Sequence, residues 1–326
     1  MATDINTLAE ICGVSKSTIS RVFTGRAKVS EELRNRVLQA ARELNYRPQQ
    51  VMARDCVAIV VNDLPNPNRR TSFSERILNQ AVFEITRRNL LSEIISVDEL
   101  ARLYNGYTKA VLLLMSENYI EQHLEQFRRL SMPILTVNKQ YDFSSSVNTD
   151  HGEGVRLALE HLHTEGHRRI GLTVDRFNNQ AGRERLEAYR KFMTAAGLPE
   201  LPVVQYTDQD YAGSSAGLTT LLDSQPTALI ACGEGVALPV FHELQERGFR
   251  IPDDISLITG ELAGVSCWMT PELTTIDQDL DALARATITQ LVTRIRNPQL
   301  PRSSSWLPTT LIKRNSVKKY SDRVCP

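Results

Sequence analysis

The first fifty residues hold polar side chains that are spaced for contact with a nucleic acid. The stretch reads T-L-A-E-I-C-G-V-S-K-S-T-I-S-R-V, with a glycine at position 13 between two apolar segments. A small residue where two helices cross, a glycine that can adopt positive φ in the turn and a branched residue that closes the core are typical of a helix-turn-helix. Ser15 would cap the second helix and place Lys16, Ser17 and Arg21 on its outward face, where a recognition helix meets base edges. An ordinary amphipathic helix pair is the alternative, but the cap and the spacing support a helix-turn-helix independently.

The residues that follow add a third helix and a positive charge. Ser30 stands before Glu31 and Glu32, an N-cap followed by acids that suit the positive end of a helix dipole. Apolar residues then recur at helical spacing, at positions 33, 37, 41 and 44. Residues 1–50 carry eight basic and five acidic side chains, whereas the whole chain has 38 of each. The basic character therefore belongs to this small head, and a phosphate backbone is its natural partner.

Reactive side chains elsewhere make a weaker case for catalysis or metal binding. His163 and His167 are four residues apart and could chelate a metal on a helix, but Gly166 breaks the helix between them. No nucleophile elbow, Walker loop or dinucleotide fingerprint follows an expected strand. The five cysteines are odd in number and widely spaced, without a C-x-x-C pair. We therefore expect reduced thiols, no catalytic residue, no metal site and no cofactor, with Asp253 and Asp254 serving a turn.

Beyond residue 54 short apolar runs alternate with amphipathic segments. Nearly continuous runs, typical of parallel strands buried on both faces, occur at 57–61, 92–96, 110–115 and 134–137, and further strands are expected at 169–173, 203–206, 228–232 and 256–259. Helical patterns lie at 72–88, 119–130, 154–165, 182–196, 214–223 and 236–247, and a helix at 279–296 and a strand near 310–313 close the series. Two such series predict two doubly wound lobes, with a cleft at the carboxyl ends of their strands.

Length and composition permit this architecture. A chain of 326 residues accommodates a small head and a two-lobed α/β body. It contains no apolar run of 18 residues, and its start, M-A-T-D-I-N, lacks the pattern of a signal peptide. We therefore expect a cytoplasmic protein with no membrane partner.

Four motifs together resemble the LacI/GalR family of bacterial transcription factors. They are G-V-S-x-x-T-I-S-R-V, G-H-R-R-I, I-P-D-D-I-S and P-x-L-T-T-I-x-Q-D, and the similarity extends from about Ile5 to about Ser316. The resemblance implies a DNA-binding head, a short hinge, and a two-lobed domain similar to periplasmic sugar-binding proteins that binds a small effector between its lobes.

The head pattern and the resemblance together indicate contact residues for both partners. The DNA-binding set is Thr7, Ser15, Lys16, Ser17, Thr18 and Arg21, with Met52 in the hinge. The effector-binding set is Phe73, Glu75, Arg185, Tyr211, Glu234, Glu261 and Gln278. Paired guanidinium donors bind vicinal hydroxyls or a carboxylate, so Arg185 suits a sugar-like or acidic effector. The alternative is that Arg183 or Arg185 pairs with helix neighbours.

The sequence departs from the family pattern at the pocket, in the first lobe and in the hinge. Longer glutamates at Glu234 and Glu261 would shrink or recharge the pocket, so an amino sugar, a cationic metabolite or no effector stay open. Residues 65–70 lengthen one connection and residues 97–104 are short for the usual second helix, so the DNA-proximal lobe is remodelled. Asp55 stands where the family has a leucine that wedges into the minor groove, and the linker is short, so either Met52 or Val51 supplies the wedge or the wedge is missing.

These observations predict an α/β protein with a helix-turn-helix head at 1–48, a shortened hinge at 49–56, a two-lobed effector domain at 57–316 and a flexible tail at 317–326. Lobe 1 would comprise about 57–147 plus 279–306, and lobe 2 about 148–278 plus 307–316. The expected function is a homodimeric regulator, a repressor, that binds an approximately palindromic operator under control of a sugar-like metabolite. A small-molecule binding protein with weakened or lost DNA binding is the alternative, and the missing catalytic motifs argue against an enzyme.

Overall fold

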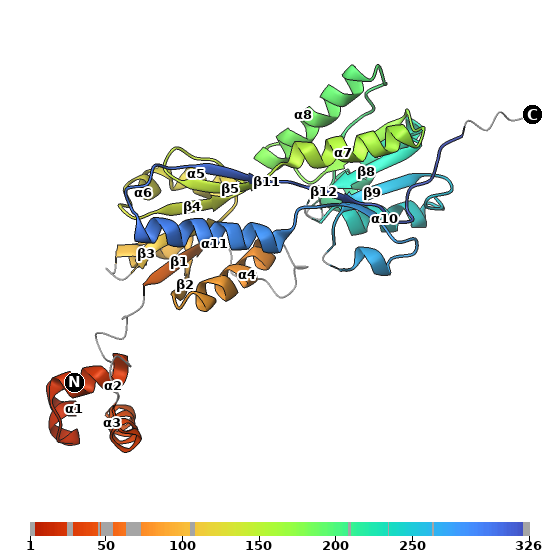
Figure 1. The fold of residues 1–326 in the computed structure, drawn as a ribbon. Helices are drawn as coiled ribbons and strands as arrows, with labels where there is room; N and C mark the ends of the chain where they lie inside the picture. The colour runs from red at the N-terminus through yellow and green to blue at the C-terminus, as the bar shows by residue number, and fades with distance from the viewer. Residues whose placement is uncertain are drawn as a thin grey trace, which may run out of the picture.

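The computed structural model describes residues 4–24, 29–44, 46, 55–62, 73–104, 108–207, 210–233, 235–262 and 264–321. Three helices form the head: α1 (Ile5–Cys12), α2 (Lys16–Thr24) and α3 (Glu31–Glu43) (Figure 1). Asp4 caps α1, and Gly13 ends it with φ of +62°. The Ser15 hydroxyl accepts from the Thr18 amide at 3.2 Å, so the predicted cap of α2 is confirmed. Apolar side chains from the three helices pack into one small core.

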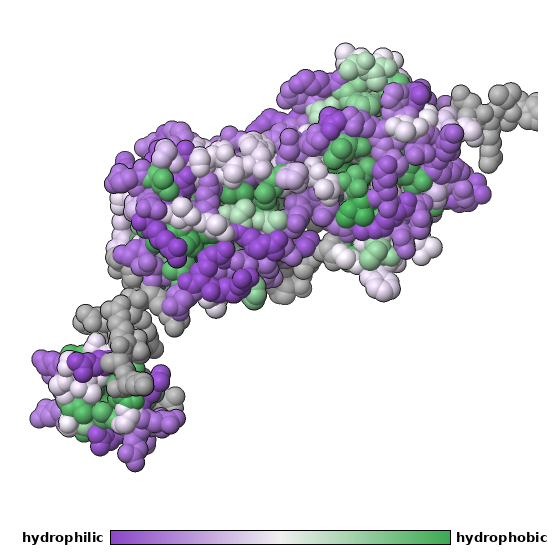
Figure 2. Space-filling view, in the orientation of Figure 1, coloured by the Kyte–Doolittle hydropathy of each residue, from purple (hydrophilic) through white to green (hydrophobic). Residues whose placement is uncertain are grey.

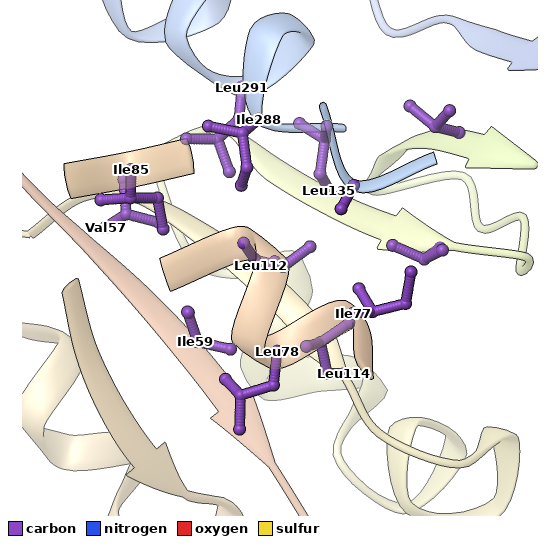
Figure 3. Close-up of a cluster of buried hydrophobic side chains, with 14 of the residues drawn as sticks. Val57, Ile59, Ile77, Leu78, Ile85, Leu112, Leu114, Leu135, Ile288 and Leu291 are labelled. Atoms are coloured by element: carbon purple, nitrogen blue, oxygen red, sulfur yellow. The ribbon is translucent and has the colours of Figure 1, made fainter. Parts of the chain in front are cut away.

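The first lobe is a parallel sheet between two helical layers. Its strands are β1 (Cys56–Val61), β2 (Leu91–Ser96), β3 (Thr108–Leu114), β4 (Ile134–Val137), β5 (Ser145–Thr149) and β11 (Ser304–Leu307), in the order β11-β5-β4-β3-β1-β2. Helices α4 (Phe73–Arg87) and α11 (Leu280–Arg296) cover one face, and Ile77, Ile288 and Leu112 belong to the buried cluster there (Figure 3). The 3-10 segment η1 (Val97–Tyr104), α5 (Glu117–Gln122) and α6 (Leu124–Arg128) cover the other.

The second lobe repeats this plan with one antiparallel edge. Its strands are β6 (Ile170–Val174), β7 (Val204–Gln205), β8 (Ala228–Cys232), β9 (Ser256–Gly260), β10 (Thr274–Asp277) and β12 (Thr310–Ile312), in the order β12-β10-β9-β8-β6-β7. Only β12, among these, runs antiparallel to its neighbour. Helices α7 (His151–Thr164) and α8 (Gln180–Ala195) cover one face, and α9 (Tyr211–Asp223) and α10 (Ala237–Glu246) the other. A short 3-10 turn, η3 (Ser266–Trp268), follows β9.

The chain passes between the lobes three times, at 149–151, 277–280 and 307–310, and these crossings lie between the two sheets in Figure 1. The face of the lobes visible in Figure 2 is mostly hydrophilic, with separate hydrophobic areas. Among the described helices, none combines the length and the apolar character needed to span a bilayer. Cys12, Cys56 and Cys232 are buried free thiols and Cys267 is an exposed one, while Cys325 lies outside the described residues.

Several local expectations need correction. The helix expected at 119–130 is broken at His123 into α5 and α6. Strands β5, β10 and β11 were not predicted, because S-S-V-N-T, T-T-I-D and S-S-W-L are short and rich in polar residues. Residues 97–104, which the sequence shows to be short for a helix, form the 3-10 segment η1. The inserted residues 65–70 lie outside the described part of the chain.

The sequence predicts a flexible tail at 317–326, but the first residues of this tail are bound to lobe 2. The Tyr320 amide donates to the Glu165 carbonyl at 2.7 Å, and the Tyr320 ring lies 5.6 Å from that of His167. The Lys318 carbonyl lies 3.0 Å from Nε2 of His167, and its ammonium pairs with Asp253 at 3.0 Å. Residues 317–321 are therefore part of the body, because their backbone groups have found partners there.

Candidate DNA-binding face and effector cleft

The outward side of α2 presents the predicted DNA contacts. Ser15, Lys16, Ser17 and Arg21 are exposed, Thr18 is half-buried, and Thr7 is exposed on α1. The Ser15 hydroxyl lies 2.7 Å from that of Ser17 and 2.9 Å from that of Thr18, so three hydroxyls gather at the start of α2. This arrangement offers donors and acceptors together with positive charge, which suits phosphates and base edges. Met52 lies outside the described residues.

Arg185 lies buried in the second turn of α8, between two polar partners. Its Nη1 is 3.2 Å from Oδ1 of Asp175, the residue that follows β6, and its Nη2 is 3.4 Å from Nδ1 of His151 at the start of α7. The Arg185 side chain is 8% exposed and that of Asp175 is 14% exposed. The arginine therefore pairs with a strand end, and not with helix neighbours.

His151 is held neutral in this environment. Burial lowers the pKa of His151 well below its ordinary value, and the positive charges of Arg185 and Lys139 lower it further. Sequence reasoning missed both His151 and Asp175. Their signal is positional, since Asp175 directly follows a buried strand and His151 follows the Asp150 cap at a crossing between lobes.

Glu261 is also compensated. It follows β9, accepts a hydrogen bond from the Thr275 hydroxyl, and pairs with Nη2 of Arg314 at 3.0 Å. Burial by itself would raise the pKa of Glu261, but hydrogen bonds from Thr275 and Arg314 lower it below the ordinary value. The carboxylate is thus ionised, and its charge is offset inside lobe 2.

The other predicted effector residues lie at separate places. Gln278 stands on the second crossing, with its Oε1 3.2 Å from the Thr149 hydroxyl of the first crossing. Tyr211 begins α9, is 51% exposed and meets the Tyr206 ring edge-on at 6.4 Å. Phe73 and Glu75 lie in the first turn of α4, and both are half-buried. Glu234 lies outside the described residues.

One contact joins the lobes beside this region. Oε1 of Glu117, on α5 of lobe 1, accepts from the backbone amide of Gln180, the first residue of α8, at 2.7 Å. Its other oxygen is 3.5 Å from Nη2 of Arg183. An anion at a helix N-terminus is favourable because the free amides and the helix dipole both attract it.

Two hollows in the described chain lie away from these residues. One, of about 460 Å³, is lined by η1 and α6, including Leu100, Tyr104 and Phe127. The other, of about 500 Å³, lies beside Phe177, Leu186 and Pro202.

The fold and these sites define a class: a helix-turn-helix head on a two-lobed α/β body of the periplasmic-binding type. Residues 4–49 match the sequence profile of bacterial regulatory proteins of the lacI family, and residues 159–317 match that of a periplasmic binding protein-like domain. The chain therefore joins a head of the lacI family of bacterial regulatory proteins to a periplasmic binding protein-like domain.

Relatives of known name support this assignment over nearly the full length. The ribose operon repressor of Haemophilus influenzae is 26% identical over 334 residues, covering 95% of this chain and 97% of that protein. The transcriptional repressor PurR of Escherichia coli is 29% identical over 337 residues, covering 97% of each. The Lac repressor dimer bound to operator and the anti-inducer ONPF has the same fold, with a TM-score of 0.77 at 22% identity over 98% of this chain and 100% of that one. A LacI family regulator from Enterococcus faecium with bound ribose has a TM-score of 0.67 at 24% identity over 82% of this chain and all of its own.

Proposed function

We propose that this protein is a sequence-specific transcriptional repressor whose operator affinity is modulated by a small sugar-like metabolite bound between its lobes. The observation that carries the proposal is the capped α2, with exposed Lys16, Ser17 and Arg21, in a lacI-type head that precedes a two-lobed body. Its named relatives are transcriptional repressors, and one structural neighbour holds ribose. Operator DNA as the partner also places the protein in the cytoplasm.

The assembly we propose is a homodimer on an approximately palindromic operator. A two-fold dimer presents two recognition helices to two half-sites related by the same symmetry. The Lac repressor neighbour is a dimer bound to operator. For the effector we propose Arg185 and Gln278 as polar contacts and Tyr211 as an aromatic one, because Arg185 pairs with Asp175 at the end of β6, Gln278 lies on a crossing and Tyr211 is exposed.

A gel-shift titration of the full-length protein tests DNA recognition. DNA from upstream of its own locus is compared with a duplex of the same composition in scrambled order, at one stated salt concentration. We expect binding to the native segment at least about 10³-fold tighter. Equal, weak binding to both duplexes would contradict the proposal and favour a small-molecule binding protein, for which a sugar panel would still raise the melting temperature.

Arg21 offers a sharper test of the proposed reading face. Replacing Arg21 with Ala should cost about 1–3 kcal/mol of operator affinity and relax the preference at one base pair in each half-site, because a base-edge donor is removed. Arg36, exposed on α3, provides the matched control, since Arg36→Ala removes the same charge from another helix. Fluorescence anisotropy over a set of half-site variants measures both effects. If Arg21→Ala binds every sequence as wild type does, Arg21 does not read a base.

A further inference from the structure

One nitrogen of His151 is buried and has no hydrogen-bond partner among the described residues. The side chain begins α7 at the first crossing between the lobes, is 6% exposed, and leaves its Nε2 without a partner. Leaving a buried polar atom unpaired is unfavourable, so an atom of this kind needs an explanation. The ring lies against Arg185 of lobe 2 and near Lys139 of lobe 1.

The contact with Arg185 determines which ring nitrogen carries the proton. Nη2 of Arg185 is 3.4 Å from Nδ1 of His151. A guanidinium has no acceptor, so Nδ1 must accept and is unprotonated. Burial and the charges of Arg185 and Lys139 oppose the imidazolium form, since they lower the pKa of His151 well below its ordinary value. The neutral ring therefore carries its hydrogen on Nε2, and the unpaired atom is a donor.

We propose that His151 is a specificity-determining residue of the effector site, which donates its Nε2–H to an acceptor oxygen of the effector. This inference rests on the proposed function, because it needs an effector in the cleft between the lobes. The donor has no partner among the described residues, and an effector oxygen would complete its hydrogen bonding.

The same contacts define the chemical class of the ligand group. His151 and Arg185 both present donors, and an ammonium group has no acceptor that could receive the Nε2–H. Asp175 already offsets the charge of Arg185 at 3.2 Å, so the ligand oxygen does not need a negative charge. The fitting group is a hydroxyl or carbonyl oxygen of a neutral ligand. An amino group at this position, which the sequence left open for an amino sugar or cationic metabolite, does not fit.

The first experiment needs no ligand. Nitrogen-15 spectra of the histidine-labelled full-length protein at pH 7 report the tautomer of each ring, and loss of one signal in His151→Gln assigns it. The thermal midpoints of wild type, His151→Phe and His151→Gln are then compared. We expect a neutral ring protonated on Nε2, and a midpoint for His151→Phe equal to or above that of wild type, because an apolar ring removes an unpaired buried donor. A proton on Nδ1, an imidazolium, or a midpoint lowered by several degrees in both variants would overturn the proposal.

The second experiment compares probes. D-ribose, D-glucose and D-glucosamine are tested for thermal stabilisation of the three proteins. Any probe that stabilises wild type should bind about 10–100-fold more weakly to His151→Phe, as expected for the loss of one buried hydrogen bond. His151→Gln should recover part of the lost affinity, because its amide group can donate a hydrogen bond. Equal stabilisation of wild type and His151→Phe would overturn the proposal. Operator binding by wild type in the gel shift is scored separately, so failure of the proposed regulator function is distinguishable from failure of this inference.

Discussion

At the scale of residues, two acids of lobe 2 are matched with arginines in largely buried pairs. Asp175 with Arg185 and Glu261 with Arg314 each join one strand end to another element. From the sequence, the longer Glu261 is expected to change the charge of the pocket. Arg314 lies 3.0 Å from Glu261 and offsets its negative charge, so Glu261 does not make the cleft more negative. A buried pair is costly to break, since the remaining charge loses both its partner and its water.

Replacing Arg185 with Ala should lower both effector binding and stability. The buried Asp175 would lose its partner, so we expect a loss of about 3–5 kcal/mol in the free energy of unfolding. The double variant Arg185→Ala, Asp175→Ala should recover part of that loss. Urea denaturation measures the free energy of unfolding of the single and the double variant.

Lys191→Ala is the matched control for this pair. Lys191 lies on the same helix and pairs with Glu187 at 3.8 Å, where both side chains are more than three-quarters exposed. Its removal should change stability by less than about 1 kcal/mol. A loss for Arg185→Ala no greater than that of Lys191→Ala would contradict the buried pair.

At the scale of elements, the tail stabilises the end of α7 and the start of β6. The Lys318 carbonyl can only accept, so His167 donates to it from Nε2 at 3.0 Å, and Nδ1 accepts from the Thr227 hydroxyl at 2.9 Å. Both ring nitrogens are thereby engaged, and burial lowers the pKa of His167, so the ring is neutral. His167, the histidine of G-H-R-R-I, therefore has a structural role, because it links the tail at Lys318 to Thr227.

Ending the chain after Val317 should therefore destabilise lobe 2. The truncation removes the Lys318 carbonyl and the Tyr320 amide, leaving His167 and the Glu165 carbonyl without these partners. We expect a loss of about 2–3 kcal/mol, seen as a midpoint lower by several degrees in thermal unfolding. Ending the chain after Ser321 keeps both contacts and should leave the midpoint unchanged. Identical midpoints for the two truncations would show that the tail contributes nothing.

At the scale of the whole molecule, Glu117 holds the lobes together on one side of the crossings. Its carboxylate binds the N-terminus of α8 at 2.7 Å and lies near Arg183. Its side chain is 15% exposed, so solvent and salt screen this contact less than a surface pair. A movement that separates α5 from the start of α8 must break this contact.

Glu117→Gln should shift the unliganded protein toward a more open arrangement, because the amide is a weaker acceptor and carries no charge for Arg183 or the helix dipole. Small-angle scattering should report a larger radius of gyration than for wild type. Glu121→Gln, exposed one turn further along the same helix, is the control and should leave the radius unchanged. An unchanged radius for Glu117→Gln would mean that the crossings by themselves determine the lobe arrangement.

The hinge connects the head to lobe 1 through Asp55, which is exposed immediately before β1. Asp55→Leu should strengthen operator binding by recovering an apolar wedge and removing two acids per dimer near phosphates. The gain should exceed that of Asp55→Asn, which removes the charge without adding a wedge. Anisotropy titrations at two salt concentrations separate the two contributions. Equal affinities for the two variants would mean that charge explains the hinge.

The amino-acid sequence by itself determined the head and the alternation of strands and helices. The Ser15 cap, the Gly13 turn and the buried strand β1 follow from contacts within a few residues and from unbroken apolar runs, so each is encoded locally. The short polar strands escaped prediction because their place in a sheet depends on neighbours that are distant in the chain.

The tertiary structure decided the partners of the buried polar groups. Arg185 meets His151, 34 residues away, and Arg314 meets Glu261, 53 residues away. Such pairs form where packing brings strand ends, helix starts and crossings together. The spacing of the two residues in the sequence does not indicate that they will meet. The unpaired donor of His151 arises in the same way, because burial and the nearby guanidinium come from elements that meet only in the folded chain.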